Sequence, residues 1–133
     1  MIAVDTNFLL RLTLKDEMSQ AARAVTLIEK TLAERQAVLI NPVVLCEYVW
    51  TLARTYKANR KELADAVRQY LDRPPYKLFD ESAVIHALAL FEAGKADFAD
   101  CLIGAMNQAA RANVTYSFDS LAAGLDAFAL PPK

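Results

Sequence analysis

Short apolar runs alternate with longer amphipathic segments along this chain of 133 residues. The short runs are typical of buried strands, whereas apolar side chains spaced three to four residues apart are typical of helices. Strands that alternate with helices form right-handed βαβ units, and such units build a parallel sheet that helices cover on both faces. The sequence therefore predicts an α/β fold with a parallel sheet of four to five strands.

The expected elements can be placed from start and stop signals. Asn41-Pro42 gives a capping residue followed by proline at the first helical position, and we expect that helix to run to about Tyr56. Asp80 and Asp97 are expected to cap later helices. The predicted strands are Ile2–Val4, Ala37–Ile40, Tyr76–Phe79, Val114–Phe118 and, with a weaker pattern, Phe128–Leu130. The other predicted helices are Met18–Arg35, Arg60–Leu71, Ser82–Ala93 (ended by Gly94), Phe98–Ala112 (closed by Asn113) and a short last helix after Asp119-Ser120.

Size and composition predict a single domain over residues 1–133. A mass of 14.7 kDa suits one hydrophobic core of ordinary size. The formal charge of −1 gives no indication of nucleic-acid binding, so such a partner would need a local basic patch. Cys46 and Cys101 each lie in an apolar run and are expected to be free thiols. No signal peptide or membrane span is apparent, and we expect a cytoplasmic protein without a membrane partner.

Four carboxylates lie beside or inside apolar sequence. Asp5 follows the first strand, Glu47 interrupts an apolar helix, Asp100 begins another helix, and Asp119 follows a strand. An anion in apolar surroundings costs several kcal/mol unless something neutralises it. In a parallel sheet, functional groups gather at the carboxyl ends of the strands. We therefore expect these acids, with Asp97 as a fifth, to be buried together around Mg²⁺ or Mn²⁺, which prefer oxygen ligands.

Four of these five acids also have a simpler structural explanation. Asp5, Asp97 and Asp119 could cap helices, and Asp100 could interact with a helix dipole. Glu47 has no such role, although it could face solvent. The joint pattern favours the metal site, because capping acids need not share one edge of a sheet with a glutamate in an apolar helix.

Other kinds of active site are disfavoured. His86 is the single histidine, which argues against zinc hydrolases and histidine-based triads. Only three glycines are present, and neither a phosphate-binding glycine loop nor a G-x-S-x-G motif occurs.

A local excess of positive charge occurs between Arg54 and Lys77. It is either a solvated helical face or a track that leads RNA phosphates to the acids. Its basic residues are Arg54, Lys57, Arg60, Lys61, Arg68, Arg73 and Lys77.

These motifs together resemble those of a PIN domain. The resemblance rests on Asp5-Thr6-Asn7, on Glu47 in the helix after Asn41-Pro42, on the run Asp97–Ile103, and on Ser117-Phe118-Asp119. Length, order and ending resemble more narrowly the VapC toxins of bacterial VapBC toxin–antitoxin modules. The resemblance covers essentially the whole chain and implies a PIN-like fold.

The resemblance also implies a role for each acid. Asp5, Glu47, Asp100 and Asp119 would form a catalytic quartet that binds the metal. Asp97 would be accessory, and Thr6 and Asn7 would orient Asp5. Ser117 stands where many members have threonine, and it keeps the hydroxyl group.

The function implied by the resemblance is that of a Mg²⁺- or Mn²⁺-dependent endoribonuclease toxin. Its expected substrate is tRNA or another translation-related RNA, and its expected partners are a second copy of the chain and a VapB-type antitoxin. A PIN nuclease of RNA maturation or quality control is one alternative. A non-catalytic binding module with the same scaffold is another.

Overall fold

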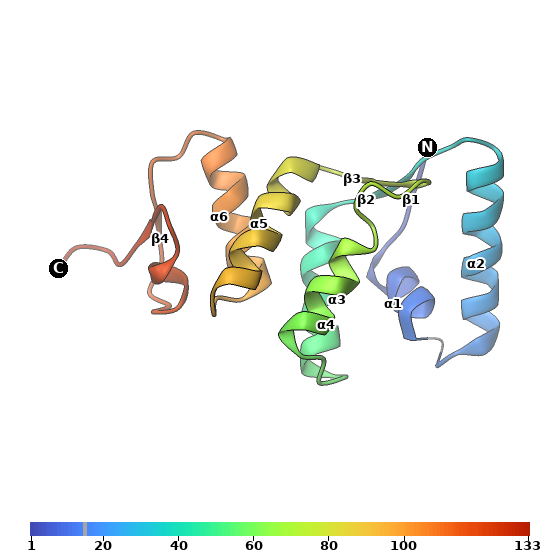
Figure 1. Ribbon diagram of the computed structural model, residues 1–133, viewed down its shortest axis with the longest axis horizontal. Helices are drawn as coiled ribbons and strands as arrows, with labels where there is room; N and C mark the ends of the chain where they lie inside the picture. The colour runs from blue at the N-terminus through green and yellow to red at the C-terminus, as the bar shows by residue number, and fades with distance from the viewer. Residues whose placement is uncertain (15) are drawn as a thin grey trace. The chain divides into compact units, whose positions relative to one another are not determined.

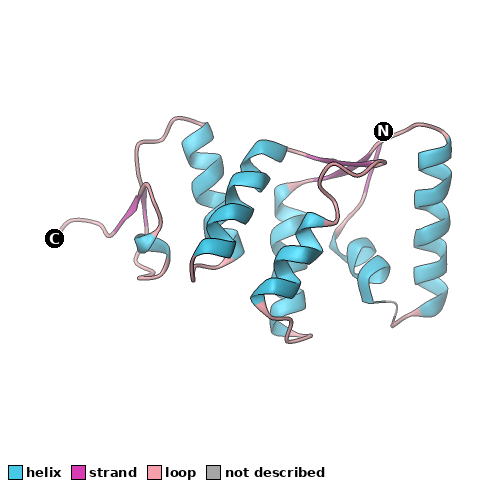
Figure 2. Ribbon diagram, in the orientation of Figure 1, coloured by secondary structure: helices cyan, strands magenta, loops and turns pink. Residues whose placement is uncertain are grey.

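The computed structural model describes residues 1–14 and 16–133, which form two compact units, Met1–Phe79 and Asp80–Lys133. Figure 1 labels the helices α1–α6 and the strands β1–β4, and Figure 2 colours helices and strands by type. Within the described chain, none of the helices is both long and apolar enough to cross a membrane.

The described residues of the first unit form three short parallel strands and four helices. Its strands β1 (Ile2–Ala3), β2 (Val38–Ile40) and β3 (Tyr76–Leu78) lie in the order β1-β2-β3, with Ile2 opposite Val38 and Val38 opposite Tyr76. Helix α1 packs against α2 and α3, and α3 packs against α4. The helices are α1 (Thr6–Leu14), α2 (Met18–Ala33), α3 (Pro42–Arg54) and α4 (Arg60–Arg68).

The core of this unit combines aliphatic side chains with tyrosines that pack edge to face. The side chains of Leu9, Leu45 and Tyr48 are completely buried. The ring of Tyr70 contacts those of Tyr48 and Tyr76 edge to face, with centroids 6.0 and 4.8 Å apart. Burial of these rings supplies a large apolar area to a unit whose strands are only two or three residues long.

The second unit is built on two packed helices, α5 (Glu81–Ala93) and α6 (Phe98–Ala109). Phe91 and Phe98 pack edge to face between them, with centroids 5.8 Å apart. Strands β4 (Thr115–Tyr116) and β5 (Phe128–Ala129) form a separate parallel pair, joined by a connection that contains the 3₁₀ helix η1 (Ala122–Gly124). The α/β class and the parallel strand pairing are therefore confirmed, with the five strands divided between sheets of three and two strands.

Helix starts agree with the prediction better than helix ends. The Asn41 side chain caps α3 by accepting a 3.0 Å hydrogen bond from the Val44 N–H. Asp80 and Asp97 occupy the N-cap positions of α5 and α6 as predicted, but neither side chain makes a capping hydrogen bond. Asp80 has a left-handed backbone (φ 58°) in place of the extended conformation of a capping residue.

Candidate metal-binding acids

Asp5 lies between β1 and α1 in the first unit. Its Oδ1 accepts a 3.0 Å hydrogen bond from the Phe8 N–H, which is the capping role considered above. This bond fixes the direction of the carboxylate and engages one oxygen, so Oδ2 has no part in the cap. The structural role and a ligand role are therefore compatible in the same side chain.

Glu47 lies on α3, and Thr6 connects it to the start of α1. The Thr6 hydroxyl donates a 3.1 Å hydrogen bond to Glu47 Oε1. Thr6 was expected to orient Asp5, but its side chain instead contacts Glu47. Thr6 directly follows Asp5 in the sequence, so this hydrogen bond links Glu47 to the residue next to Asp5.

The expectation that the four acids are buried is wrong for three of them. Asp5, Glu47 and Asp119 are exposed, and Asp100 is half-buried. The apolar neighbours of Glu47 explain the error, because the helix divides them between two faces. Val43 and Trp50, which share its face, are 67% and 60% exposed, whereas the buried residues Val44, Leu45, Tyr48 and Val49 lie on the other side.

The remaining acids form a group in the second unit. Asp97 precedes α6, and Asp100 lies in its first turn. Partial burial raises the pKa of the Asp100 carboxyl, and the negative charges of Asp119 and then Asp97 raise that pKa further. The charges of Asp119 and Asp97 thus repel that of Asp100, and a cation beside Asp100 would relieve the repulsion.

Asp119 is held by a short hydrogen-bonded turn. Its Oδ1 accepts from the N–H groups of Leu121 and Ala122 at 2.9 and 3.1 Å. Its own N–H donates to Ser117 Oγ at 3.0 Å, so the Ser117 hydroxyl fixes the turn before the acid. The turn leads into η1, where a short last helix was expected.

The possible metal ligands fall into two groups, one with Asp5, Glu47 and Thr6 and one with Asp97, Asp100 and Asp119. The ligand atoms of both groups suit a hard cation. They are carboxylate and hydroxyl oxygens, whereas Cys101, the nearest sulfur in sequence to Asp100, is fully buried. Across residues 1–14 and 16–133, however, no three His, Cys, Asp or Glu side chains are gathered in a way that could hold a metal ion. The structure groups Glu47 with Thr6, next to Asp5, and Asp100 with Asp97 and Asp119. The complete quartet remains a prediction.

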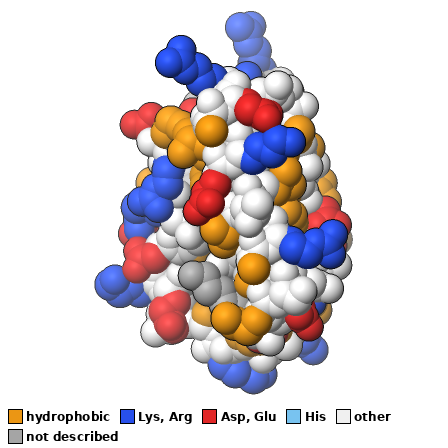
Figure 3. Space-filling view, turned by 90° about the vertical axis from the view of Figure 1, so that its right-hand side faces the viewer, with side chains coloured by type: hydrophobic (Ala, Val, Ile, Leu, Met, Phe, Trp, Pro, Cys, Tyr) orange, Lys and Arg blue, Asp and Glu red, His pale blue; other side chains and the backbone are white. Residues whose placement is uncertain are grey.

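Some of the basic residues between Arg54 and Lys77 already have partners within the protein. Lys61 and Arg68 contact Asp65 at 3.0 and 2.9 Å, and the Arg54 guanidinium lies 5.6 Å from the centre of the Trp50 ring. Figure 3 shows the side of the molecule on which α2 lies in Figure 1, and basic and acidic side chains are interspersed there. A role in guiding RNA stays a prediction.

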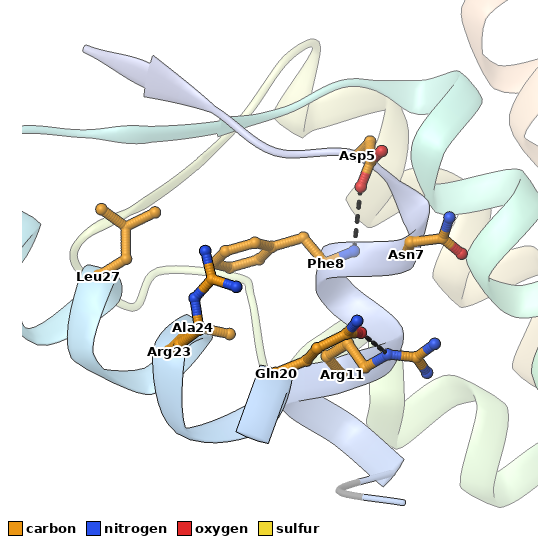
Figure 4. Close-up of a pocket in the computed structure, with 8 residues that line it drawn as sticks. All are labelled: Asp5, Asn7, Phe8, Arg11, Gln20, Arg23, Ala24 and Leu27. Atoms are coloured by element: carbon orange, nitrogen blue, oxygen red, sulfur yellow. Dashed lines mark hydrogen bonds between the residues drawn. The ribbon is translucent and has the colours of Figure 1, made fainter. Parts of the chain in front are cut away.

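A feature that the motifs did not reveal is a cavity of about 460 Å³ beside Asp5. It lies between α1 and α2 (Figure 4). The helical spacing of Asn7 and Arg11 on one helix, and of Gln20, Arg23 and Leu27 on the next, was a signal present in the sequence. Its lining residues are Asp5, Asn7, Phe8, Arg11, Gln20, Arg23, Ala24 and Leu27.

Comparison with known families identifies the class of protein. The PIN domain family model matches residues 2–126, nearly the whole chain. The chain therefore belongs to the PIN domain family, whose members are generally nucleases that use divalent metals. A search among curated proteins finds no match.

Proposed function

We propose that this PIN-domain protein is a Mg²⁺- or Mn²⁺-dependent endoribonuclease and the toxin of a type II toxin–antitoxin module of the VapBC kind. The observation that carries the nuclease proposal is the match of the PIN domain family model to residues 2–126. The effect of the Asp119 and Asp97 charges on Asp100, at the start of α6, agrees with it. Like charges held this close destabilise a metal-free protein, and binding of a divalent cation offsets that cost. The toxin proposal rests on the sequence resemblance.

In this proposal, Asp5, Glu47, Asp100 and Asp119 hold the metal. When bound, the metal lowers the pKa of a water molecule and stabilises charge on the phosphate. Thr6 fixes Glu47 by its hydrogen bond, and the backbone N–H groups of Leu121 and Ala122 fix Asp119. Attack of water on phosphorus, in line with the leaving oxygen, yields a 5′-phosphate and a 3′-hydroxyl. The reaction needs neither a histidine nor the 2′-hydroxyl of the RNA as nucleophile.

The test is RNA cleavage by purified protein that is free of antitoxin. We expect tRNA or another translation-related RNA to be cut in Mg²⁺ or Mn²⁺ and not in EDTA. Asp5→Asn and Asp100→Asn should each lower kcat/KM by roughly 100-fold or more, because each removes a charge that holds the metal at the reacting phosphate. A folded protein that cuts no RNA under these conditions would overturn the proposal.

The partners expected of a toxin can be tested separately. Brief induction in cells should arrest growth, and the new RNA 5′ ends should map to a few sites. A small antitoxin should co-purify with the native chain, and light scattering should give the mass of a dimer once the antitoxin is removed. Cleavage without growth arrest or antitoxin would instead favour a nuclease of RNA maturation or quality control.

A further inference from the structure

The cavity between α1 and α2 combines cationic and apolar walls beside one of the proposed metal-binding acids. Its volume of about 460 Å³ lies within the range of small-molecule sites, roughly 300–1,000 Å³. Figure 4 shows Phe8 extending from α1 toward the α2 residues Arg23, Ala24 and Leu27. Asp5 lies at the same cavity and is held by the N–H of Phe8, the residue that contributes this aromatic wall.

The two arginines at the cavity differ in how firmly they are held. Arg11 donates from Nε to Gln20 Oε1 at 2.6 Å and contacts Asp16 at 3.4 Å. These contacts hold the guanidinium in place and leave further N–H donors available for a ligand. Arg23 is exposed and has no hydrogen bond or ion pair with any residue in the described part of the chain. A fixed and an unengaged guanidinium thus line one cavity.

We propose that this cavity binds one nucleotide of the RNA strand, next to the phosphodiester that is cut. The base would lie against Phe8 and Leu27, and Arg23, aided by Arg11, would contact a flanking phosphate. This inference rests on the proposed function and adds to it a subsite that positions the substrate beside Asp5.

Charge favours RNA over a peptide as the occupant. A phosphodiester strand presents an anion at every nucleotide and a flat base between anions, which matches guanidinium groups beside an aromatic ring. The formal charge of the chain is −1, so attraction of RNA must come from local cations such as these. A protein partner in the same cavity is an alternative outcome of the test.

The first experiment measures RNA binding without cleavage. A fluorescent single-stranded RNA of the cleaved sequence is titrated, in Mg²⁺, with the Asp100→Asn protein and with the same protein that also carries Arg23→Gln. Arg23→Gln should weaken Kd about tenfold. It should also reduce the slope of log Kd against log salt by roughly 0.7, as expected for one lost phosphate contact to a single strand.

A matched control exists on the same helix. Lys30→Gln removes one positive charge from α2 at an exposed position outside the cavity, where Lys30 pairs with Glu34 at 3.8 Å. It should leave Kd and the salt slope nearly unchanged. Arg23→Lys, which keeps the charge, should recover part of the affinity.

A second pair of variants tests the apolar wall. Leu27 and Leu32 both lie on α2 and are 38% and 48% exposed, but only Leu27 lines the cavity. Leu27→Glu should weaken RNA binding at least as much as Arg23→Gln, whereas Leu32→Glu should have little effect. Because both positions are exposed, circular dichroism should show both variants to be folded.

The outcomes separate this inference from the proposed function. If RNA is cut and bound but Arg23→Gln and Leu27→Glu behave like their controls, the subsite is wrong and the nuclease remains. If the native chain neither binds nor cuts RNA, both fail. If a purified partner protein, and not RNA, protects α1 and α2 from hydrogen exchange, the cavity is a protein-docking site and the inference is overturned.

Discussion

Two buried tyrosines of the first unit, Tyr48 and Tyr70, differ in what their hydroxyl groups contact. The Tyr48 hydroxyl lies 2.6 Å from Thr13 Oγ1 and accepts from Gln69 Nε2 at 3.2 Å. The Tyr70 hydroxyl is buried without a hydrogen-bond partner among the described residues. Burial raises the pKa of both phenols, so both stay neutral at ordinary pH.

This difference predicts opposite results for the same substitution. Tyr48→Phe should lower the free energy of unfolding by about 1–2 kcal/mol, because Thr13 and Gln69 lose their buried partner. Tyr70→Phe should be neutral or stabilising by up to about 1 kcal/mol, because it removes a hydroxyl that burial leaves unsatisfied. Urea unfolding measures both. An equal loss in the two variants would show that Tyr70 has a partner.

Asp100 gives a prediction for pH. Its pKa is raised above the ordinary 3.8 by burial and by the charges of Asp119 and Asp97. The folded state therefore binds this proton more tightly than the unfolded state does, and the ionised carboxylate lowers stability at pH values above the raised pKa. As the pH falls through that pKa, the group becomes neutral and the penalty disappears.

Asp100→Asn should therefore raise the melting temperature of the metal-free protein by a few degrees at pH 7. The advantage over the native chain should shrink as the pH is lowered toward 4. Asp126→Asn, an exposed acid of the same unit, is the control and should show no such dependence. Thermal melts in EDTA from pH 7 to 4 provide the measurement, and a variant less stable than the native chain at pH 7 would contradict the argument.

For the helices, the sequence predicted most of the starting residues, but it placed several of the ends too far along the chain. Asn41-Pro42 marks the start of α3 because the side chain that caps the helix is adjacent in sequence. Helix α4 stops at Arg68 and α6 at Ala109, whereas the amphipathic patterns continue to Leu71 and Ala112. Soon after these ends, the backbone becomes left-handed at Asp72 (φ 48°) and Arg111 (φ 69°). Glycine is the usual residue at such positions. Because Asp72 and Arg111 are not glycines, the sequence did not indicate that these helices end early.

The packing of α6 against β5 depends on a residue without a side chain. A Cβ at Gly104 would meet the ring of Phe128 at a distance that real atoms do not adopt, whereas a Cβ at Gly124 would meet nothing. Gly104→Ala should therefore cost about 1–3 kcal/mol of stability, as overpacking does. Gly124→Ala should be close to neutral.

A double-mutant cycle identifies the cause of that loss. Phe128→Ala will itself cost stability, since the ring is half-buried. In its presence, Gly104→Ala should cost much less than in the native chain, because the clashing ring is gone. If the cost is the same in both backgrounds, Phe128 is not responsible and the close approach has been misread.

For the whole molecule, the α/β class and the parallel strand pairs followed from the alternation of short apolar runs with amphipathic helices. The candidate acids were easy to find because charge stands out in apolar sequence. Their exposure was not foreseen, since flanking residues such as Val43 and Trp50 turned out to share the exposed face of Glu47. The cavity between α1 and α2 was not predicted, because only the tertiary structure determines which residues of the two helices face each other.

The quartet proposal involves both compact units of the chain, because Asp5 and Glu47 belong to one unit and Asp100 and Asp119 to the other. If all four hold one metal, Mn²⁺ must stabilise the chain in a way that needs acids from both units. At a concentration about 100 times its Kd, Mn²⁺ should add roughly 2.7 kcal/mol of stability and raise the melting temperature. EDTA should reverse the rise, and Asp5→Asn and Asp100→Asn should each abolish it. If Asp100→Asn removes the effect and Asp5→Asn does not, the ion is held by the second unit alone. A native chain whose melting temperature does not respond to millimolar Mn²⁺ would instead be a binding module that keeps the scaffold without the metal.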